Sequence, residues 1–184
     1  LSTSGCSRCY SSRIMTTADE HREAAPAVVR FSVITVSDSR TVEDDVSGKR
    51  IGELALAEGH EVLDREIVAD DRLEIRTRLQ AVLSDEKVDV VVLNGGTGYS
   101  PRDVTTEVVE PLLDTTLHGF GELFRMLSWK QVGAAAMLSR AVAGLIGTRA
   151  VFVLPGSPKA VELAMQQLIL PEAAHLLSQA RKSE

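Results

Sequence analysis

Apolar positions along the chain follow two patterns, which together predict alternating strands and helices. Short runs rich in Val, Ile and Leu are typical of buried strands, and they cover residues 28–36, 61–68, 88–93 and 149–154. Apolar residues spaced three or four apart predict helices over residues 47–58, 71–84, 121–128, 134–145 and 158–169, with a short helix after Asp103 that breaks near Pro111 and a last one that begins at Pro171. Strands that alternate with helices favour a mostly parallel sheet covered on both faces. We therefore expect an α/β fold.

Three of the predicted helices begin at residues that cap helix N-termini well. Ser47 stands at the start of the first helix and can cap it. Asp71 followed by Glu74 resembles a capping box. Ser157 is followed by Pro158, and proline fits best at the first helical position. Each of these residues therefore has a structural role that competes with any functional one.

Residues 1–26 differ in composition from the rest of the chain. They hold Ser, Thr and charged residues without periodic apolar spacing, so we expect a disordered extension followed by a single domain over residues 27–184. The extension lacks the apolar stretch of a secretory signal. It holds both cysteines, Cys6 and Cys9, which would need two further ligands to bind zinc. The lack of cysteine elsewhere fits a reducing compartment, so we expect a cytoplasmic protein.

Composition and charge exclude two broad classes of function. Hydrophobic residues make up 44% of the 184 residues and charged residues 25%, which is ordinary for a soluble globular protein. The net charge of -6 argues against a general nucleic-acid binder. The chain has no apolar run near the ~20 residues that a membrane span needs. We therefore expect no nucleic-acid partner and no membrane segment.

Polar segments follow all four predicted strands. They read Ser37-Asp38-Ser39-Arg40, Ala69-Asp70-Asp71, Asn94-Gly95-Gly96-Thr97-Gly98 and Pro155-Gly156-Ser157-Pro158-Lys159. Turns use such residues anyway, so one segment alone would carry little weight. Ligands of open α/β sheets lie beyond the carboxyl ends of the strands, and four such segments at one edge predict a single large polar site.

The third segment opens the stretch NGGTGYSPRDVT, at residues 94–105. Its three glycines allow a ligand to approach the backbone closely, and a helix N-terminus follows, as in the anion sites of α/β proteins. The stretch matches neither the dinucleotide-binding fingerprint nor the Walker loop. Two interpretations remain at this point: a tight strand-to-helix connection and a cradle for a phosphate or a pterin.

Asp70 and Asp103 are the two carboxylates that we expect to serve this edge. Asp103 either caps the helix that follows it or belongs to the site. Asp70 is either a solvated loop acid or points into the site, because Asp71 takes the capping role. Two carboxylates from different loops can hold one Mg²⁺, and phosphate oxygens can complete its coordination shell.

Two basic residues near these segments have open roles. Lys159 lies in the first turn of a predicted helix, against the helix dipole, so it either meets a phosphate or lies at the surface. Arg140 either grips a phosphate or faces solvent. The four histidines show no metal-site spacing.

The motifs, taken in order, resemble those of the MoaB/MogA family of molybdenum-cofactor biosynthesis proteins. They are GGTG with PRDVT, GFGELFR at 119–125, AMLSRAVAG at 136–144 and LPGSP at 154–158. TVSDSR at 35–40 and DDVSG at 44–48 are most similar to the MoaB branch. The resemblance covers roughly residues 28–180. It implies a three-layer α/β/α molybdopterin-binding fold and a homotrimer or homohexamer.

The resemblance also implies an activity. Family members adenylylate molybdopterin with Mg-ATP and release pyrophosphate, and Asp70 and Asp103 match the positions implicated in this transfer. By the same analogy, together with the strand-end segments, we expect substrate contacts from Ser37, Gly95, Gly96, Thr97, Gly98, Ser139, Pro155, Gly156 and Ser157. Other molybdenum-cofactor biosynthesis proteins are further expected partners.

Two other functions stay open on the sequence. One is a non-catalytic protein that binds or carries molybdopterin without transferring AMP. The other is an unrelated nucleotide-binding α/β protein. Retention of both Asp70 and Asp103 favours the enzyme.

Overall fold

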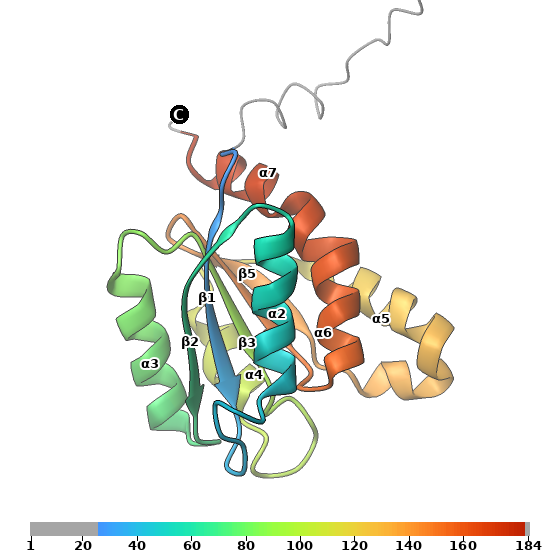
Figure 1. Cartoon of the computed structure of the whole chain (residues 1–184). Helices are drawn as coiled ribbons and strands as arrows, with labels where there is room; N and C mark the ends of the chain where they lie inside the picture. The colour runs from blue at the N-terminus through green and yellow to red at the C-terminus, as the bar shows by residue number, and fades with distance from the viewer. Residues whose placement is uncertain (1–25, 183–184) are drawn as a thin grey trace, which may run out of the picture.

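A six-stranded sheet forms the centre of the molecule in the computed structural model, which describes residues 26–182 (Figure 1). The strands are β1 (Arg30–Val36), β2 (Glu61–Val68), β3 (Val90–Asn94), β4 (Thr115–Thr116), β5 (Val142–Ile146) and β6 (Arg149–Leu154). Their order across the sheet is β2-β1-β3-β6-β5-β4. The first four in this order are parallel, whereas β5 and β4 are antiparallel to their neighbours. The expected mostly parallel sheet is confirmed.

Helices cover both faces of the sheet and complete the three layers. One face carries α2 (Val46–Ala57), α5 (His118–Val132), α6 (Pro158–Ala164) and α7 (Leu170–Ala180), and Figure 1 shows α2 and α6 side by side there. The other face carries α3 (Arg72–Ser84) and α4 (Thr105–Val109). Short 3-10 turns lie at Glu110–Leu112 and Gly133–Leu138, and a π-helical turn at Met165–Ile169 joins α6 to α7.

Strand side chains alternate between two cores, as the period of a strand requires. In β3, Val90 and Val92 join the core beneath α2, α5, α6 and α7, whereas Val91 and Leu93 join the core beneath α3 and α4. All four side chains are fully buried. The near-continuous apolar runs of the sequence therefore reflect strands that are buried on both faces.

The predicted helix over residues 134–145 is wrong. Gly133, at φ 59°, ends α5, and a 3-10 turn leads instead into strand β5. β5 pairs with β6 through a hairpin in which Ile146 faces Arg149 and Gly147 adopts φ 57°. The alanines favour a helix locally, but pairing with β6 prevails because β propensity depends on tertiary context. The turn glycine in this hairpin was the signal that the helical reading overlooked.

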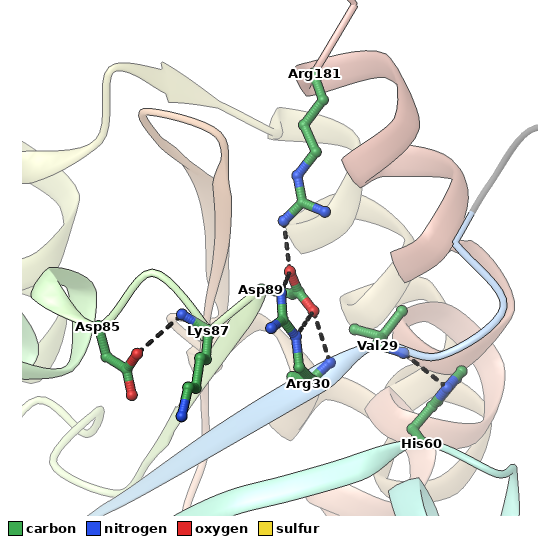
Figure 2. A network of polar contacts seen from close by, with 7 residues as sticks. All are labelled: Val29, Arg30, His60, Asp85, Lys87, Asp89 and Arg181. Atoms are coloured by element: carbon green, nitrogen blue, oxygen red, sulfur yellow. Dashed lines mark hydrogen bonds and ion pairs between the residues drawn. The ribbon is translucent and has the colours of Figure 1, made fainter.

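A buried ion-pair network ties the two ends of the described chain to the sheet (Figure 2). The carboxylate of Asp89, only 2% exposed, accepts hydrogen bonds from the backbone and side-chain nitrogens of Arg30, each at 2.9 Å, and from Arg181 beyond α7. Burial opposes ionisation, but these hydrogen bonds prevail and lower the pKa of Asp89. The network lies at the amino ends of β1 and β3, so it stabilises the edge of the sheet opposite the predicted site.

Two further expectations concern the N-terminal extension and membrane-spanning helices. The N-terminal extension, with Cys6 and Cys9, lies outside the described residues, so its state stays a prediction. None of the helices within residues 26–182 is long and apolar enough to cross a membrane.

Candidate functional site

Four loops meet at the carboxyl edge of the four parallel strands. Because β2, β1, β3 and β6 are neighbours in the sheet and run in one direction, the segments that follow them leave the sheet at the same edge. This edge lies at the bottom of Figure 1, where the loops after β1 and β3 project. The sequence-based expectation that the four polar segments gather at one edge therefore agrees with the topology.

The glycine loop after β3 lies directly against two of the other loops. Gly95, at φ 98°, donates a hydrogen bond from its nitrogen to the carbonyl of Leu154 at 3.1 Å. A side chain on Gly95 would overlap the carbonyl of Val36, and one on Gly156 would lie 3.1 Å from the Cα of Gly95. Glycine is required at position 95 both for its backbone angle and for this close approach.

A buried chain of hydrogen bonds holds Asn94, the residue from which the glycine loop starts. The side-chain nitrogen of Asn94 donates to Thr35 Oγ1 at 2.9 Å, and that hydroxyl donates to Asp45 Oδ2 at 2.7 Å. The other oxygen of Asp45 accepts from the nitrogen of Gly48 at 2.9 Å and so caps α2. These contacts join β3, β1 and α2 into one rigid unit.

Asp45 therefore replaces Ser47 as the cap of α2, and the expectation for Ser47 is wrong. The hydroxyl of Ser47 instead donates to the carbonyl of Gly156 at 2.7 Å, which links α2 to the loop after β6. The acidic residue in DDVSG was the available signal, since aspartate caps helices at least as well as serine.

Asp70 and Asp103 both lie against the glycine loop. A side chain on Gly96 would overlap both Asp70 Oδ1 and Thr105 Oγ1, and one on Gly98 would lie 2.9 Å from Asp103 Oδ2. Asp70 Oδ1 and Thr105 Oγ1 are buried and have no hydrogen-bond partner among the described residues. The structure thus brings the two predicted carboxylates to one loop and leaves a buried carboxylate oxygen available for a ligand.

The acids at this edge lie close enough to influence one another electrostatically. Burial raises the pKa of Asp70, and the negative charges of Asp103 and Asp38 raise it further, whereas Arg102 opposes the rise. Asp38, which the sequence did not single out, accepts a hydrogen bond from the nitrogen of Asp70 at 3.0 Å and forms an ion pair with Arg102. Its place in the polar segment that follows β1 was the only signal for it.

Asp103 does not cap a helix. α4 begins two residues later, at Thr105, and has no side-chain cap. The carboxylate of Asp103 accepts a hydrogen bond from the nitrogen of Ser100 at 3.1 Å, within its own loop. In contrast, Asp71 caps α3 as expected, accepting from the nitrogens of Leu73 and Glu74.

The remaining predicted residues occupy different parts of the edge. Ser157 caps α6 as expected, Ser37 accepts a hydrogen bond from the nitrogen of Ser39, and Thr97 is buried in the glycine loop. The hydroxyl of Ser139 is buried without a hydrogen-bond partner among the described residues. Pro155 begins the loop after β6.

The two basic residues with open roles differ in their surroundings. Lys159 is exposed and lines a hollow of about 570 Å³ between α5 and α6, away from both carboxylates. Arg140 is largely buried and donates to backbone carbonyls of the glycine loop, so the expectation that it faces solvent is wrong.

A smaller hollow adjoins the glycine loop through Arg140. It measures about 270 Å³ and is lined by Thr106, His118 and Arg125 among others. Arg125 also reaches the carbonyl of Ser139 at 3.4 Å. The motifs GFGELFR and AMLSRAVAG, which the sequence presents separately, therefore pack together beside the site.

Asp70 and Asp103 provide only part of the ligand set that a hard cation such as Mg²⁺ needs. Within residues 26–182, no group of three or more His, Cys, Asp or Glu side chains is arranged to hold a metal ion. Asp70 and Asp103 provide oxygen ligands of the kind that Mg²⁺ prefers, and Mg²⁺ commonly takes one or two carboxylates together with substrate phosphates. The donor set therefore fits a cation that arrives with a phosphate ligand.

Sequence comparisons identify close relatives of the chain. A family described as "Probable molybdopterin binding domain" matches residues 32–175. A Bacillus cereus protein named Molybdenum cofactor biosynthesis protein B is 51% identical over 158 residues, which is 85% of this chain and 94% of the relative. The protein of the same name from Bacillus subtilis is 49% identical over 166 residues, covering 90% of this chain and 98% of the relative.

Solved structures show the same fold. A crystal structure of Molybdenum cofactor biosynthesis protein B has a TM-score of 0.83 at 49% identity, covering 86% of this chain and 99% of its own. The tungsten cofactor synthesizing protein MoaB from Pyrococcus furiosus has a TM-score of 0.77 at 41% identity, covering 86% and 100%. A MogA structure has a TM-score of 0.75 at 27% identity, covering 82% and 99%. The likeness therefore spans nearly the whole length of each neighbour.

We expect Asp70→Asn to stabilise the ligand-free protein at neutral pH. A raised pKa means that the ionised carboxylate is disfavoured in the folded state, so stability falls as pH rises through the interval above the ordinary aspartate pKa. The melting temperature of the variant should exceed that of the wild type at about pH 7, and the difference should shrink toward about pH 3.

Thermal unfolding across this pH range measures the effect. Asp71→Asn is the matched control, because it neutralises the adjacent carboxylate, which instead accepts two backbone hydrogen bonds. A lower melting temperature for Asp70→Asn, or a difference independent of pH, contradicts the expected strain at Asp70.

Proposed function

The chain belongs to the family of probable molybdopterin-binding domains, and on that premise we propose that it adenylylates molybdopterin with Mg-ATP. The observation that carries the proposal is the pair Asp70 and Asp103, which lie against Gly96 and Gly98 of the glycine loop, with Asp70 Oδ1 buried and free of protein hydrogen bonds among the described residues. A site for the pterin alone would have little use for a second carboxylate beside a phosphate cradle.

The proposed reaction joins two anions. A phosphate oxygen of molybdopterin attacks the α-phosphorus of ATP, a new P–O bond forms, and the bond to the leaving pyrophosphate breaks. Such a transfer needs positioning and charge neutralisation rather than a covalent nucleophile on the protein. A bound Mg²⁺ would neutralise phosphate charge.

The protein's own residues have separate tasks in this proposal. Asp70 and Asp103 hold the cation. Gly95, Gly96 and Gly98 let phosphate groups approach backbone nitrogens. The remaining substrate contacts come from Ser37, Thr97, Ser139, Pro155, Gly156 and Ser157. The hydrogen bonds from Asn94 to Thr35 and from Thr35 to Asp45 hold the loops after β3 and β1 in place relative to each other, which limits the reorganisation needed during the reaction.

We further propose that residues 27–184 form one molybdopterin-binding domain in a cytoplasmic homotrimer or homohexamer. A row of apolar side chains on α5 supports the oligomer: Leu123, Met126, Trp129 and Val132 are 46%, 53%, 61% and 55% exposed. Met137 and Leu138, in the 3-10 turn that contacts α5, are 71% and 56% exposed. Exposed apolar groups gathered on neighbouring elements typically mark protein interfaces.

We expect Asp103→Asn to abolish turnover while leaving pterin binding intact. The amide keeps the oxygen that Ser100 needs but removes the charge that holds the cation. The rate of adenylyl-molybdopterin formation should fall by roughly 10²–10³-fold, as when other transition-state-stabilising groups are removed. The measurement is product and pyrophosphate release with purified protein, molybdopterin and Mg-ATP.

Asp85→Asn is the matched control for this experiment. Asp85 also accepts a backbone hydrogen bond within a loop, from Lys87, but it lies at the other end of β3. Its variant should turn over normally. Normal turnover by Asp103→Asn would refute the role of that carboxylate, and pterin binding by the wild type without pyrophosphate release would replace the enzyme with a carrier protein.

We expect Trp129→Glu to dissociate the proposed oligomer. A charge on this apolar row would have to be buried without a partner at the interface, which is costly. Light scattering after size exclusion should give three or six times the chain mass for the wild type and a smaller mass for the variant. Leu73→Glu, at an exposed apolar residue on α3, is the control. A monomeric wild type would refute the oligomer.

A further inference from the structure

Arg140 makes an unusual number of contacts with a single loop. It follows the 3-10 turn Gly133–Leu138 and precedes β5, far in sequence from the glycine loop. Its Nε donates to the carbonyl of Thr97 at 2.9 Å, and its Nη2 donates to the carbonyl of Asp103 at 2.9 Å and to that of Gly98. The side chain is only 16% exposed, although arginine is mostly exposed in proteins.

The carbonyls that Arg140 contacts lie at the two ends of the loop's exposed tip. Residues 98–102 are exposed, whereas Thr97 before them is buried and Asp103 after them is half-buried. Within the tip, Asp103 and Ser100 bond one another through backbone and side chain. Arg140 contacts both ends of this small turn, while Arg102 in the tip itself pairs with Asp38 of the loop after β1.

The guanidinium is also oriented from two other sides. Nη1 forms an ion pair with Glu107 on α4, and the guanidinium carbon lies 5.1 Å from the centre of the Tyr99 ring, within cation–π range. Although burial raises the pKa of Glu107, hydrogen bonding to Arg140 prevails and lowers it. The charge of Arg140 is therefore paired with a glutamate at the protein surface.

The number of N–H donors already in use argues against phosphate binding by Arg140. An arginine side chain has five N–H donors, and four of them are directed at Thr97, Gly98, Asp103 and Glu107. With its charge paired and most donors committed, Arg140 is poorly placed to grip a phosphate. Its planar fork spreads its donors over three carbonyls, a geometry that the compact ammonium of a lysine does not reproduce.

We propose that Arg140 is a positioning residue, which fixes the backbone of the glycine loop from Thr97 to Asp103 and thereby holds the Asp103 carboxylate beside Asp70. Its effect on catalysis rests on the proposed function. Its effect on the order of the loop does not, because the contacts exist without a substrate.

The first test measures loop order in the ligand-free protein. Amide hydrogen exchange of residues 98–104 should be at least roughly tenfold faster in Arg140→Gln and Arg140→Lys than in the wild type, because opening the loop exposes the amides of Ser100 and Asp103. Amides of β3 and α3 should be unchanged. Arg50→Gln is the control, because Arg50 also pairs with a glutamate on another helix but lies outside the site.

Two outcomes of this exchange experiment would overturn the proposal. Unchanged exchange in residues 98–104 would show that the loop is fixed without Arg140. Faster exchange throughout the core would show that the residue only supports global stability. Both readings hold even if the wild type transfers no adenylyl group, so failure of the proposed function and failure of this inference are distinguishable.

The second test measures the consequence for turnover. The Mg²⁺ concentration that gives half-maximal rate should rise at least roughly tenfold in both variants. The value of kcat should fall by up to roughly 10²-fold, because a small misplacement of a catalytic group can lower the rate by this factor. General destabilisation would lower the active fraction without shifting this Mg²⁺ concentration. A lysine variant with wild-type Mg²⁺ dependence and rate would overturn the proposal, since charge alone would then suffice.

Discussion

The buried hydrogen-bond chain from Asn94 through Thr35 to Asp45 is the contact on which the site depends. Each residue belongs to a different element, so the chain fixes β3, β1 and the start of α2 relative to one another. Asp45 and Asn94 are 2% and 0% exposed, and polar groups buried this deeply are costly unless they are paired. Loss of the Thr35 hydroxyl would therefore remove a partner from both Asn94 and Asp45, and the loops after β1 and β3 would lose their common anchor.

Glycine extends this rigid arrangement outward to the site. Gly95 and Gly156 let the loops after β3 and β6 touch, and Gly96 leaves room for the carboxylate of Asp70. The edge that results carries three neighbouring acids, Asp38, Asp70 and Asp103, and one of them has a raised pKa. The protein thus holds an electrostatically strained group at its proposed site, while the network of Asp89 stabilises the opposite edge of the sheet.

Much of this arrangement could be predicted from local sequence, because it depends on local rules. Apolar runs revealed the parallel strands, and the strand-end rule gathered Asp70, Asp103 and the glycine loop at one edge. The caps at Asp71 and Ser157 were predicted correctly because capping involves only the next three residues.

Each miss involves a partner outside the segment concerned, and for Ser47 and Arg140 that partner is distant in sequence. Residues 134–145 looked helical because their alanines and leucines suit a helix, but β5 forms there by pairing with β6 through the turn at Gly147. Ser47 looked like a cap because its true partner, Gly156, lies 109 residues away. Arg140 offered no local sign of its contacts with Thr97 and Asp103. Such contacts follow from the folded topology rather than from any short pattern.

The central claim is that four loops at one edge of the sheet form a single site around Asp70 and Asp103. Titration of isotope-labelled protein with molybdopterin and Mg-ATP, followed by backbone amide NMR shifts, tests it most directly. We expect the largest changes in residues 37–40, 69–71, 95–105 and 155–157, with Arg30 and Asp89 at the opposite edge unaffected. Changes concentrated in the hollow between α5 and α6, or at the amino ends of the strands, would contradict the account.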